Sequence, residues 1–190
     1  EAIAHLSSAR QRFDRVGSRW GVAKASNALA DPLRDRGDFA EAEAMYREAL
    51  AHLEALGAQE ARFVEANLGI LALQQRKTDV ARTMLTRCDG ALRRRGGESA
   101  LFIAIELGFL ATSAFDGQWA EFDRCLARGR EQLASGHYVD PDLALLLAIA
   151  GDGAREGGEL ERARACYLLA AAEWRKLGRD AEAVRLERES

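Results

Sequence analysis

A repeat of about forty residues runs along this chain and limits its possible folds more than any other feature. Residues 37–50 read GDFAEAEAMYREAL and residues 158–171 read GELERARACYLLAA, so a Gly, an acid, a large apolar residue, an Ala and a Tyr recur at one spacing. Two weaker copies lie between them. The corresponding residues Ala42, Ala81, Phe122 and Ala163 are separated by 39, 41 and 41 positions. A period of this length is typical of stacked helical repeats.

The apolar residues of each copy follow the period of an α-helix. Steps of three and four residues connect Phe39, Ala42, Tyr46 and Ala49, which therefore share one helix face. A second helix is predicted before each copy, because an apolar residue followed by a small one recurs there. These pairs are Leu29-Ala30, Leu68-Gly69, Leu107-Gly108 and Ala150-Gly151. Small residues allow two antiparallel helices to approach within about 8–10 Å.

The third copy departs from this spacing. The small residue stands 12 positions before its partner in three copies, but Gly108 stands 14 positions before Phe122. We therefore expect two extra residues in the turn around 115–118. Asp140 and Pro141 predict a helix start, with an N-cap acid before Pro at the first helical position. The predicted helices are 1–16, 19–36, 38–56, 59–75, 78–95, 98–115, 118–135, 141–157, 159–177 and 180–189.

These elements predict one all-α domain over residues 1–190, in which helix pairs stack side by side. A half repeat, 1–17, precedes four repeats at about 18–57, 58–97, 98–136 and 137–178, and a capping helix covers 179–190. Glycines mark the helix ends at Gly17, Gly57, Gly96 or Gly97, Gly136 and Gly178. Because a helical repeat cannot bury its apolar face alone, the opening half repeat suggests a segment cut from a longer protein.

Composition and charge exclude several classes of protein. Hydrophobic residues make up 48% of the 190 residues, and the net charge is −3. This balance disfavours a strongly basic protein that binds nucleic acid or a membrane surface directly. No apolar run approaches the roughly 18 residues that predict a membrane-spanning helix. Three cysteines without a close pair indicate a reducing compartment, so a cytoplasmic location is expected.

Nothing in the sequence predicts catalysis, a metal or a cofactor. The histidines, His5, His52 and His137, share no ligand spacing, and no phosphate loop or nucleophile elbow occurs. Buried structural thiols are the favoured interpretation of Cys88 and Cys166. A basic patch, Arg93–Arg95 with Arg82 and Arg87 upstream, could contact phosphate. We favour cations that complement a helix C-terminus.

The repeat resembles the tetratricopeptide repeat (TPR), in its long form of about 40 rather than 34 residues and without the closing Pro. Such long repeats resemble those of bacterial multidomain signalling proteins that carry Ser/Thr kinase or nucleotide-switched transcription-factor modules. The resemblance implies a right-handed α-solenoid and a non-catalytic scaffold that binds proteins or peptides. The residues that carry it are Leu29, Gly37, Phe39, Ala42, Tyr46, Ala49, Gly151, Gly158, Leu160, Ala163, Tyr167 and Ala170.

The same resemblance implies a partner-binding wall on the concave side of the first helix of each repeat. In it, Asn27 and Asn67 would hold a peptide backbone, since amides both donate and accept. The alternative is that Phe63, Phe102 and Phe109 pack between repeats and leave no open groove. The implied wall residues are Lys24, Asn27, Asp31 and Arg34; Phe63, Ala66, Asn67, Ile70 and Gln74; Phe102, Ile105, Glu106 and Phe109; and Leu145, Ala148, Asp152 and Arg155.

Two other functions stay open at this point. The first is a sensor that binds a small ligand within the superhelix and controls attached domains or the oligomeric state. The second is a structural spacer that associates with itself through its N-terminal face, where Leu6 and Phe13 would lie.

Pro32 lies inside a predicted helix, and its effect on that helix has two interpretations. A kink there would turn Asp31 and the carbonyl of Ala28 toward the wall, whereas a gentle bend would only fit the neighbouring helix.

Overall fold

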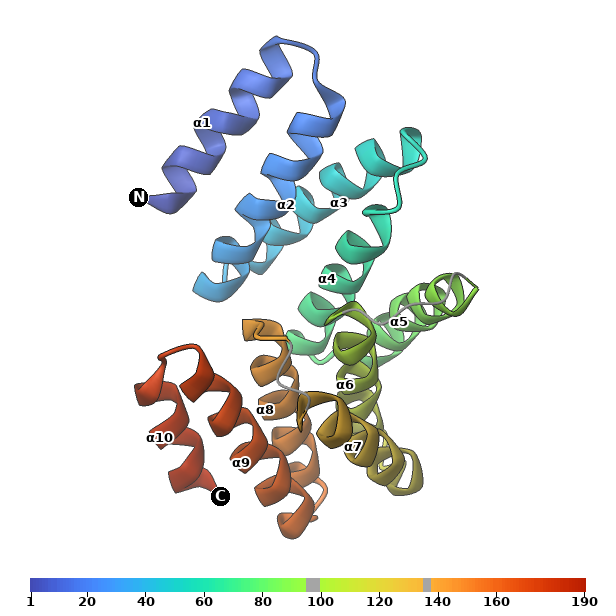
Figure 1. Cartoon of the computed structure of the whole chain (residues 1–190), viewed down its shortest axis with the longest axis vertical. Helices are drawn as coiled ribbons and strands as arrows, with labels where there is room; N and C mark the ends of the chain where they lie inside the picture. The colour runs from blue at the N-terminus through green and yellow to red at the C-terminus, as the bar shows by residue number, and fades with distance from the viewer. Residues whose placement is uncertain (95–99, 135–137) are drawn as a thin grey trace. The chain divides into compact units, whose positions relative to one another are not determined.

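The computed structural model describes residues 1–94, 100–134 and 138–190 (Figure 1). Within these ranges the chain forms ten α-helices and no strand, which confirms the predicted all-α class. Predicted helix ends within the described ranges agree with the observed ends to within two residues. The predicted glycine stops at 96, 97 and 136 lie outside the described residues, as does His137. The helices are α1 (Ala2–Arg15), α2 (Arg19–Arg36), α3 (Phe39–Ala55), α4 (Ala61–Gln74), α5 (Thr78–Arg93), α6 (Ala100–Phe115), α7 (Trp119–Ala134), α8 (Pro141–Glu156), α9 (Leu160–Lys176) and α10 (Asp180–Glu189).

The chain divides into two compact units, Glu1–Leu71 and Ala72–Ser190. In the first unit, α2 packs against both α1 and α3. Glu48 of α3 ties the three helices together, because its carboxylate accepts two hydrogen bonds from Arg10 of α1 at 2.7 Å and one from Ser26 of α2 at 2.6 Å. These hydrogen bonds hold the pKa of the Glu48 carboxylate below its usual value, and those from Arg10 have the largest effect.

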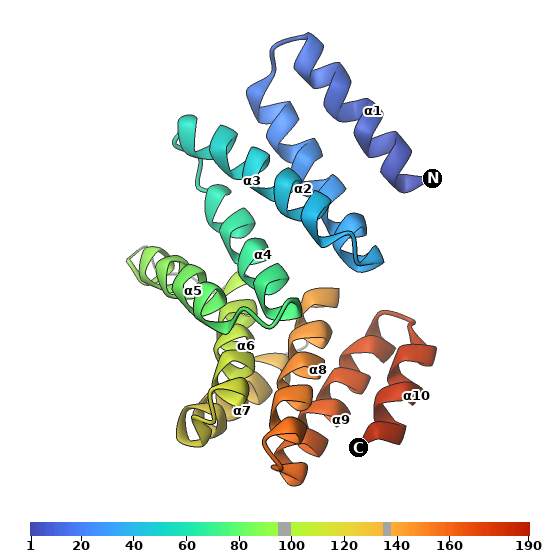
Figure 2. The same ribbon diagram turned by 180° about the vertical axis from the view of Figure 1, so that it is seen from behind.

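In the second unit, the helices follow one another as packed neighbours. The helix α6 packs against α5, α7 and α8, and α9 packs against α8 and α10 (Figure 2). The second helices α7 and α9 are also linked, because Arg162 donates to both carboxylate oxygens of Asp123 at 2.9 and 2.8 Å. Both the first and the second helices of adjacent repeats are thus in contact within this unit.

One turn joins the two helices of every repeat. In each repeat the residue after a left-handed position donates its backbone N–H to the carbonyl oxygen five residues earlier. The left-handed position is Gly37, Gly117 or Gly158 in three repeats, but Arg76 in the second, where φ is 60°. It always stands five residues before the core position that Ala42 occupies in the first repeat.

The third repeat therefore carries no extra residues in its turn, and that prediction was wrong. Counted back from the turn, the position that Gly151 holds in the fourth repeat is occupied by Leu110 in the third. Gly108 instead packs against the preceding helix, where an added Cβ would lie 2.6 Å from Leu85 of α5. The prediction had assigned Gly108 to the contact between the two helices of its own repeat, whereas it lies at the contact with the preceding repeat.

Helix α2 continues past Pro32 to Arg36, and the Tyr46 hydroxyl donates a hydrogen bond to Asp31. Asp31, which is half-buried, is therefore held by the second helix of its own repeat. The predicted start of α8 is confirmed, since Asp140 accepts the backbone N–H of Asp142 at 2.9 Å with Pro141 in the first turn. Among the described helices, none is both long enough and apolar enough to cross a bilayer.

Candidate partner-binding surface

The best-supported part of the predicted wall lies in the first unit, where α2 and α4 meet. The Asn67 side chain donates from Nδ2 to Oδ1 of Asn27 at 3.2 Å, so two residues 40 positions apart lie side by side. Phe63, one turn before Asn67 on α4, is 49% exposed, and Lys24, about one turn before Asn27 on α2, is exposed. We call Lys24, Asn27, Phe63 and Asn67 the first-helix surface.

This surface combines an apolar ring with amide groups that can still form hydrogen bonds. The Asn27–Asn67 bond leaves the amide nitrogen of Asn27 and the amide oxygen of Asn67 without a partner in the described part of the chain. One donor and one acceptor are therefore available next to the exposed ring of Phe63. Such a set suits a peptide, whose backbone supplies both an N–H and a C=O.

Trp20 extends this region and was missed by the sequence reasoning. Its side chain is 52% exposed, and the ammonium group of Lys24 lies 5.4 Å from the centre of its ring. The distance suits a cation–π contact. A signal was present, because Trp20 stands four residues before Lys24 and so on the same helix face.

Three predicted wall residues of the first unit are buried and cannot touch a partner in this structure. Ile70 and Ala66 are each 1% exposed, and Arg34 is 4% exposed. For α4 the cause is that its apolar residues lie on more than one face, since Val64 and Leu68 are buried with Ile70. Such a helix is covered on more than one side, and the resemblance alone could not show this.

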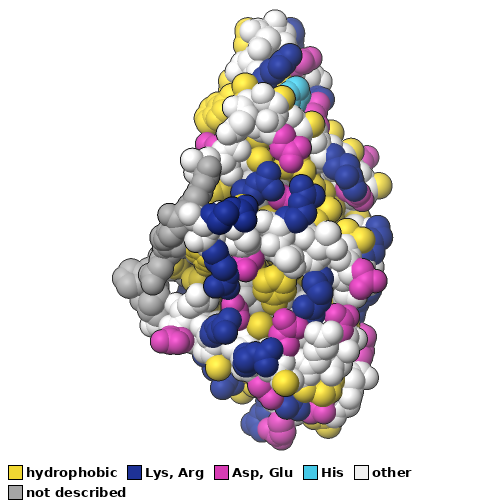
Figure 3. Space-filling view, turned by 90° about the vertical axis from the view of Figure 1, so that its right-hand side faces the viewer, with side chains coloured by type: hydrophobic (Ala, Val, Ile, Leu, Met, Phe, Trp, Pro, Cys, Tyr) yellow, Lys and Arg dark blue, Asp and Glu magenta, His cyan; other side chains and the backbone are white. Residues whose placement is uncertain are grey.

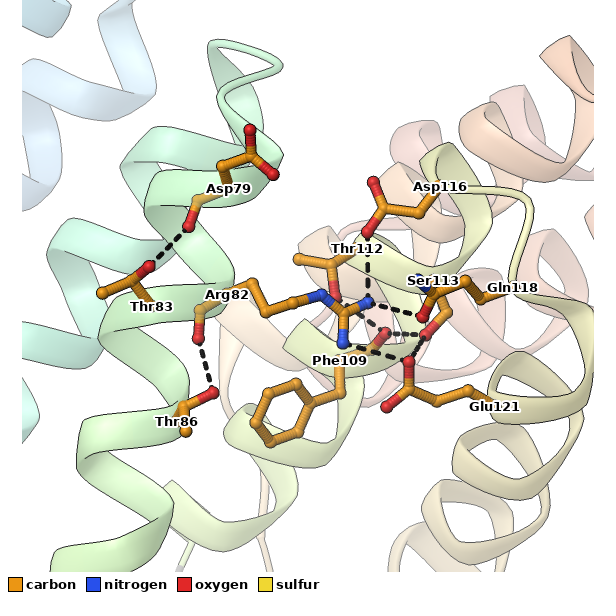
Figure 4. Close-up of polar contacts among 10 residues, drawn as sticks. All are labelled: Asp79, Arg82, Thr83, Thr86, Phe109, Thr112, Ser113, Asp116, Gln118 and Glu121. Atoms are coloured by element: carbon orange, nitrogen blue, oxygen red, sulfur yellow. Dashed lines mark hydrogen bonds and ion pairs between the residues drawn. The ribbon is translucent and has the colours of Figure 1, made fainter.

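The third repeat contributes less to a wall than predicted. Ile105 is 2% exposed, and Glu106 is buried, with Arg128 3.5 Å from its carboxylate. Phe102 and Phe109 are half-buried, and Phe109 points toward α5 (Figure 4), as expected if it packs between adjacent repeats. Because the turn has no insertion, the first-helix positions that correspond to the other repeats are Ala104, Leu107, Ala111 and Ala114.

In the fourth repeat the polar wall residues are engaged with their own helix pair. Asp152 accepts a hydrogen bond from the Tyr167 hydroxyl at 2.8 Å, and Arg155 lies 3.5 Å from the same carboxylate oxygen. The guanidinium of Arg155 is also 5.8 Å from the centre of the Tyr167 ring. Arg155 is nonetheless exposed, whereas Leu145, Ala148 and Asp152 are half-buried. Of these four predicted wall residues, Arg155 has the largest exposed fraction, 49% of its side chain.

Gln74, the last residue of α4, belongs to the second unit and is half-buried. Its side-chain oxygen is buried and has no hydrogen-bond partner among the described residues. Gln74 therefore places a buried polar atom at the C-terminal end of α4. Its exposed area is smaller than that of Phe63 or Lys24.

Two arginines of the predicted basic patch, Arg82 and Arg93, form ion pairs within the chain. Arg82 reaches from α5 to Glu121 at 3.0 Å and to Asp116 at 3.2 Å (Figure 4). Glu121 also accepts a hydrogen bond from Ser113 at 2.9 Å. On α5 itself, Arg93 in the last turn pairs with Asp89 at 2.7 Å. Figure 3 shows that Lys and Arg side chains on that face are interspersed with Asp and Glu.

This arrangement supports the structural interpretation of the patch, with one change. Arg93 lies at a helix C-terminus, as expected, but Arg82 lies in the second turn of α5 and links neighbouring repeats instead. Arg95 lies outside the described residues. A phosphate group at this place would have to compete with the carboxylates that already hold Arg82.

The described residues hold no group of three or more His, Cys, Asp or Glu side chains that could bind a metal. Cys88, Cys125 and Cys166 are buried and form no disulfide between described residues. Burial raises the pKa of the Cys166 thiol to about 12, so this group stays protonated at neutral pH. Burial and the nearby Glu106 carboxylate raise the pKa of Cys125 to about 12 as well. Neither thiol is activated as a nucleophile.

The chain was compared with models of known protein families and with curated proteins. Neither comparison found a match.

Proposed function

We propose that this chain is a non-catalytic, TPR-like interaction module that binds a peptide or an extended protein segment at the first-helix surface. In this proposal the helix pairs stack into a right-handed solenoid, and the module works in the cytoplasm within a bacterial signalling or regulatory protein. The repeated turn and the repeated helix pairs support the solenoid. The long TPR-like repeat supports the signalling context.

The observation that carries the proposal is the Asn27–Asn67 pair beside Phe63. Two amides from different repeats meet, and each keeps one hydrogen-bonding group open to a ligand. An exposed aromatic ring next to them offers an apolar anchor, and aromatic residues are enriched at the centres of protein interfaces. The ammonium of Lys24 adds one positive charge at the edge.

The charge of this surface defines the peptide that it fits. Lys24 is a single cation, and the clusters of Lys and Arg with which some TPR proteins hold acidic C-termini are not found among the four residues of the surface. We therefore expect a peptide recognised through its backbone and an apolar side chain. A terminal carboxylate is not required.

The proposal is tested by selecting displayed random peptides on the immobilised full chain and measuring their affinity for variants. Phe63→Asp, and separately the double variant Asn27→Ala with Asn67→Ala, should weaken the selected peptides about tenfold or more. Ile70 is not a suitable site for this test, because an Asp there would be buried and would unfold the helix pair.

The matched control is Leu168→Asp, which introduces the same charge at an apolar residue of similar exposure, 45%, on a second helix. This variant should bind the selected peptides as the unmodified chain does. Equal affinities for Phe63→Asp and the unmodified chain, with unchanged helix content, would refute the proposed surface. Stabilisation by small metabolites in a thermal-shift screen, without any selected peptide, would favour the sensor function instead.

A further inference from the structure

The turn between α1 and α2 forms a second exposed surface, which adjoins the first-helix surface where Trp20 contacts Lys24. Three large apolar side chains gather there: Phe13 is 40% exposed, Val16 is 75% exposed and Trp20 is 52% exposed. We call these residues, with Arg12, Arg15 and Arg19, the α1–α2 corner. It is the blue turn that joins the first two helices in Figure 1.

Local contacts hold the corner in a defined shape. Gly17 takes a left-handed conformation with φ of 70°, and Ser18 caps α2 by accepting the backbone N–H of Gly21 at 3.2 Å. The ring of Phe13 lies directly on Gly21, since an added Cβ there would be 2.3 Å from the ring. The turn and the position of the Phe13 ring are therefore fixed before a partner binds.

The charge at the corner is opposite in sign to that of the chain. Residues 10–24 contain five Lys or Arg residues and one acid, a net charge of +4, although the whole chain has a net charge of −3. The other residues together carry a net charge of −7. Arg10 is occupied by Glu48, but Arg12, Arg15 and Arg19 are exposed and form no ion pair with any described residue.

We propose that the α1–α2 corner docks an acidic protein segment that also carries apolar side chains. Its exposed arginines would pair with the acids, and Val16 and Trp20 would contact the apolar groups. Arg and aromatic residues are the types enriched at protein interfaces, with a polar rim around an apolar centre. A cluster of one sign on a chain of the other sign also steers a short partner of opposite charge to that place.

A short acidic segment fits this corner better than an extended polyanion does. A nucleic acid or an anionic bilayer is larger than the corner and also meets the rest of the chain, whose net charge is −7. A peptide of a few residues interacts with the corner alone. This inference does not depend on the first-helix surface, whose residues other than Lys24 lie outside residues 10–24.

The test measures binding of two soluble copolymers to the full chain, poly(Glu,Tyr) and poly(Glu,Ala), which share their charge but differ in apolar content. We expect tighter binding of poly(Glu,Tyr), weakened about tenfold or more by the triple variant Arg12→Glu, Arg15→Glu, Arg19→Glu and by added salt. The variant Val16→Ser with Trp20→Ser should remove the preference for the Tyr copolymer.

The matched control reverses three exposed arginines elsewhere, Arg124, Arg130 and Arg164, which form no ion pair between described residues. This control changes the net charge equally and should leave binding intact. If the Glu triple variant does not fold, the corresponding Gln variants of both sets make the same comparison.

Three outcomes would overturn the proposal. The first is equal binding of both copolymers to the unmodified chain, and the second is equal losses in the corner and control triples. The third is that the corner arginines are needed for phosphatidylserine vesicles or for single-stranded oligothymidylate while poly(Glu,Tyr) does not bind. None of these outcomes tests the first-helix surface, which is tested with variants of Phe63, Asn27 and Asn67.

Discussion

The Tyr167 hydroxyl donates a hydrogen bond to Oδ1 of Asp152 at 2.8 Å and so joins the two helices of the fourth repeat. The first repeat contains the same contact between Tyr46 and Asp31, again 15 residues apart. The side chains of both tyrosines are completely buried. The pair is therefore a repeated structural bond, and it engages two of the acids that the TPR resemblance assigned to a binding wall.

Replacing Tyr167 by Phe should lower the free energy of unfolding by about 1 kcal/mol. The ring still fills its site, but the bond to the carboxylate is lost, and the half-buried position of Asp152 limits the cost. Tyr46→Phe should have a similar effect. Denaturant unfolding measures both, with Tyr138→Phe as the control, for which a change within about 0.5 kcal/mol is expected. Equal losses in all three variants would contradict the assignment.

Gly151→Ala and Gly90→Ala should have effects of opposite sign. An added Cβ at Gly151 would lie 2.6 Å from the buried Tyr167 ring, so Ala there should destabilise the chain by about 1–2 kcal/mol even though it favours helix. At Gly90 of α5 the nearest atom, Arg94 Nη1, is 3.6 Å away. Ala there should stabilise the chain by about 0.5–1 kcal/mol. Thermal or denaturant unfolding compares them, and a stabilising effect of Gly151→Ala like that expected of Gly90→Ala would refute the close crossing.

The buried thiols predict that stability falls in alkaline solution. Burial raises the pKa of Cys166 to about 12 in the folded chain, whereas an exposed thiol titrates near about 8.5. A raised pKa makes the unfolded state lose its proton first, so stability is complete below about pH 8.5 and falls as the pH rises toward 12. Each such thiol accounts for at most about 1.4 kcal/mol per pH unit in this range.

Cys166→Ala should reduce this slope, although it lowers stability at neutral pH by leaving a small cavity. Denaturant unfolding at neutral pH and at about pH 10 separates the two effects, since only the difference between the two pH values reports the titration. The burial of this thiol would be contradicted if Cys166→Ala left the slope unchanged.

Arg82→Met should lower the free energy of unfolding by about 1 kcal/mol. Arg82 pairs with Glu121 and Asp116, and all three side chains are about three-quarters covered, so screening reduces but does not remove the attraction. The exposed Arg124→Met is the control, with an expected change within about 0.5 kcal/mol. The difference between the variants should shrink at high salt. A difference that is independent of salt would show that packing, not charge, is the cause.

Arg76→Gly should be more stable than Arg76→Ala by about 1 kcal/mol. Arg76 has a φ of 60°, a conformation that Gly adopts without strain and Ala does not. Both variants lose the same side-chain contacts, the stacking 4.3 Å from the Phe115 ring and the ion pair with Glu156 at 2.8 Å. The difference between their free energies of unfolding therefore measures the cost of the left-handed backbone conformation at this position. Equal stability would show that the turn relaxes to another conformation.

Periodicity was sufficient to predict the helices, because an apolar face repeating every three to four residues can be buried only in helical form. It was not sufficient for the third repeat. Gly108 has the right identity and nearly the right place for the crossing within a repeat, yet it accommodates Leu85 of the preceding helix. A small residue shows that something approaches closely, but it does not show which helix that is.

The candidate surface was predicted only in part for a related reason. Phe63 and Lys24 are exposed as expected, and Asn27 meets Asn67, but Ile70 on the same helix as Phe63 is buried. Burial depends on how many neighbours surround a helix, and a one-dimensional pattern does not count neighbours. The corner formed by Phe13, Val16 and Trp20 was missed because those residues are brought together by a turn.

The sequence by itself determined the all-α class and the ten helices of the described ranges, because these depend on local periodicity and on residues that end helices. Only the tertiary structure decided which polar groups stay open, since Asp31 and Asp152 are taken up by tyrosines 15 residues away while Asn27 and Asn67 keep free groups. Local patterns specify elements, whereas exposure and pairing depend on the side chains that distant segments bring to the same place.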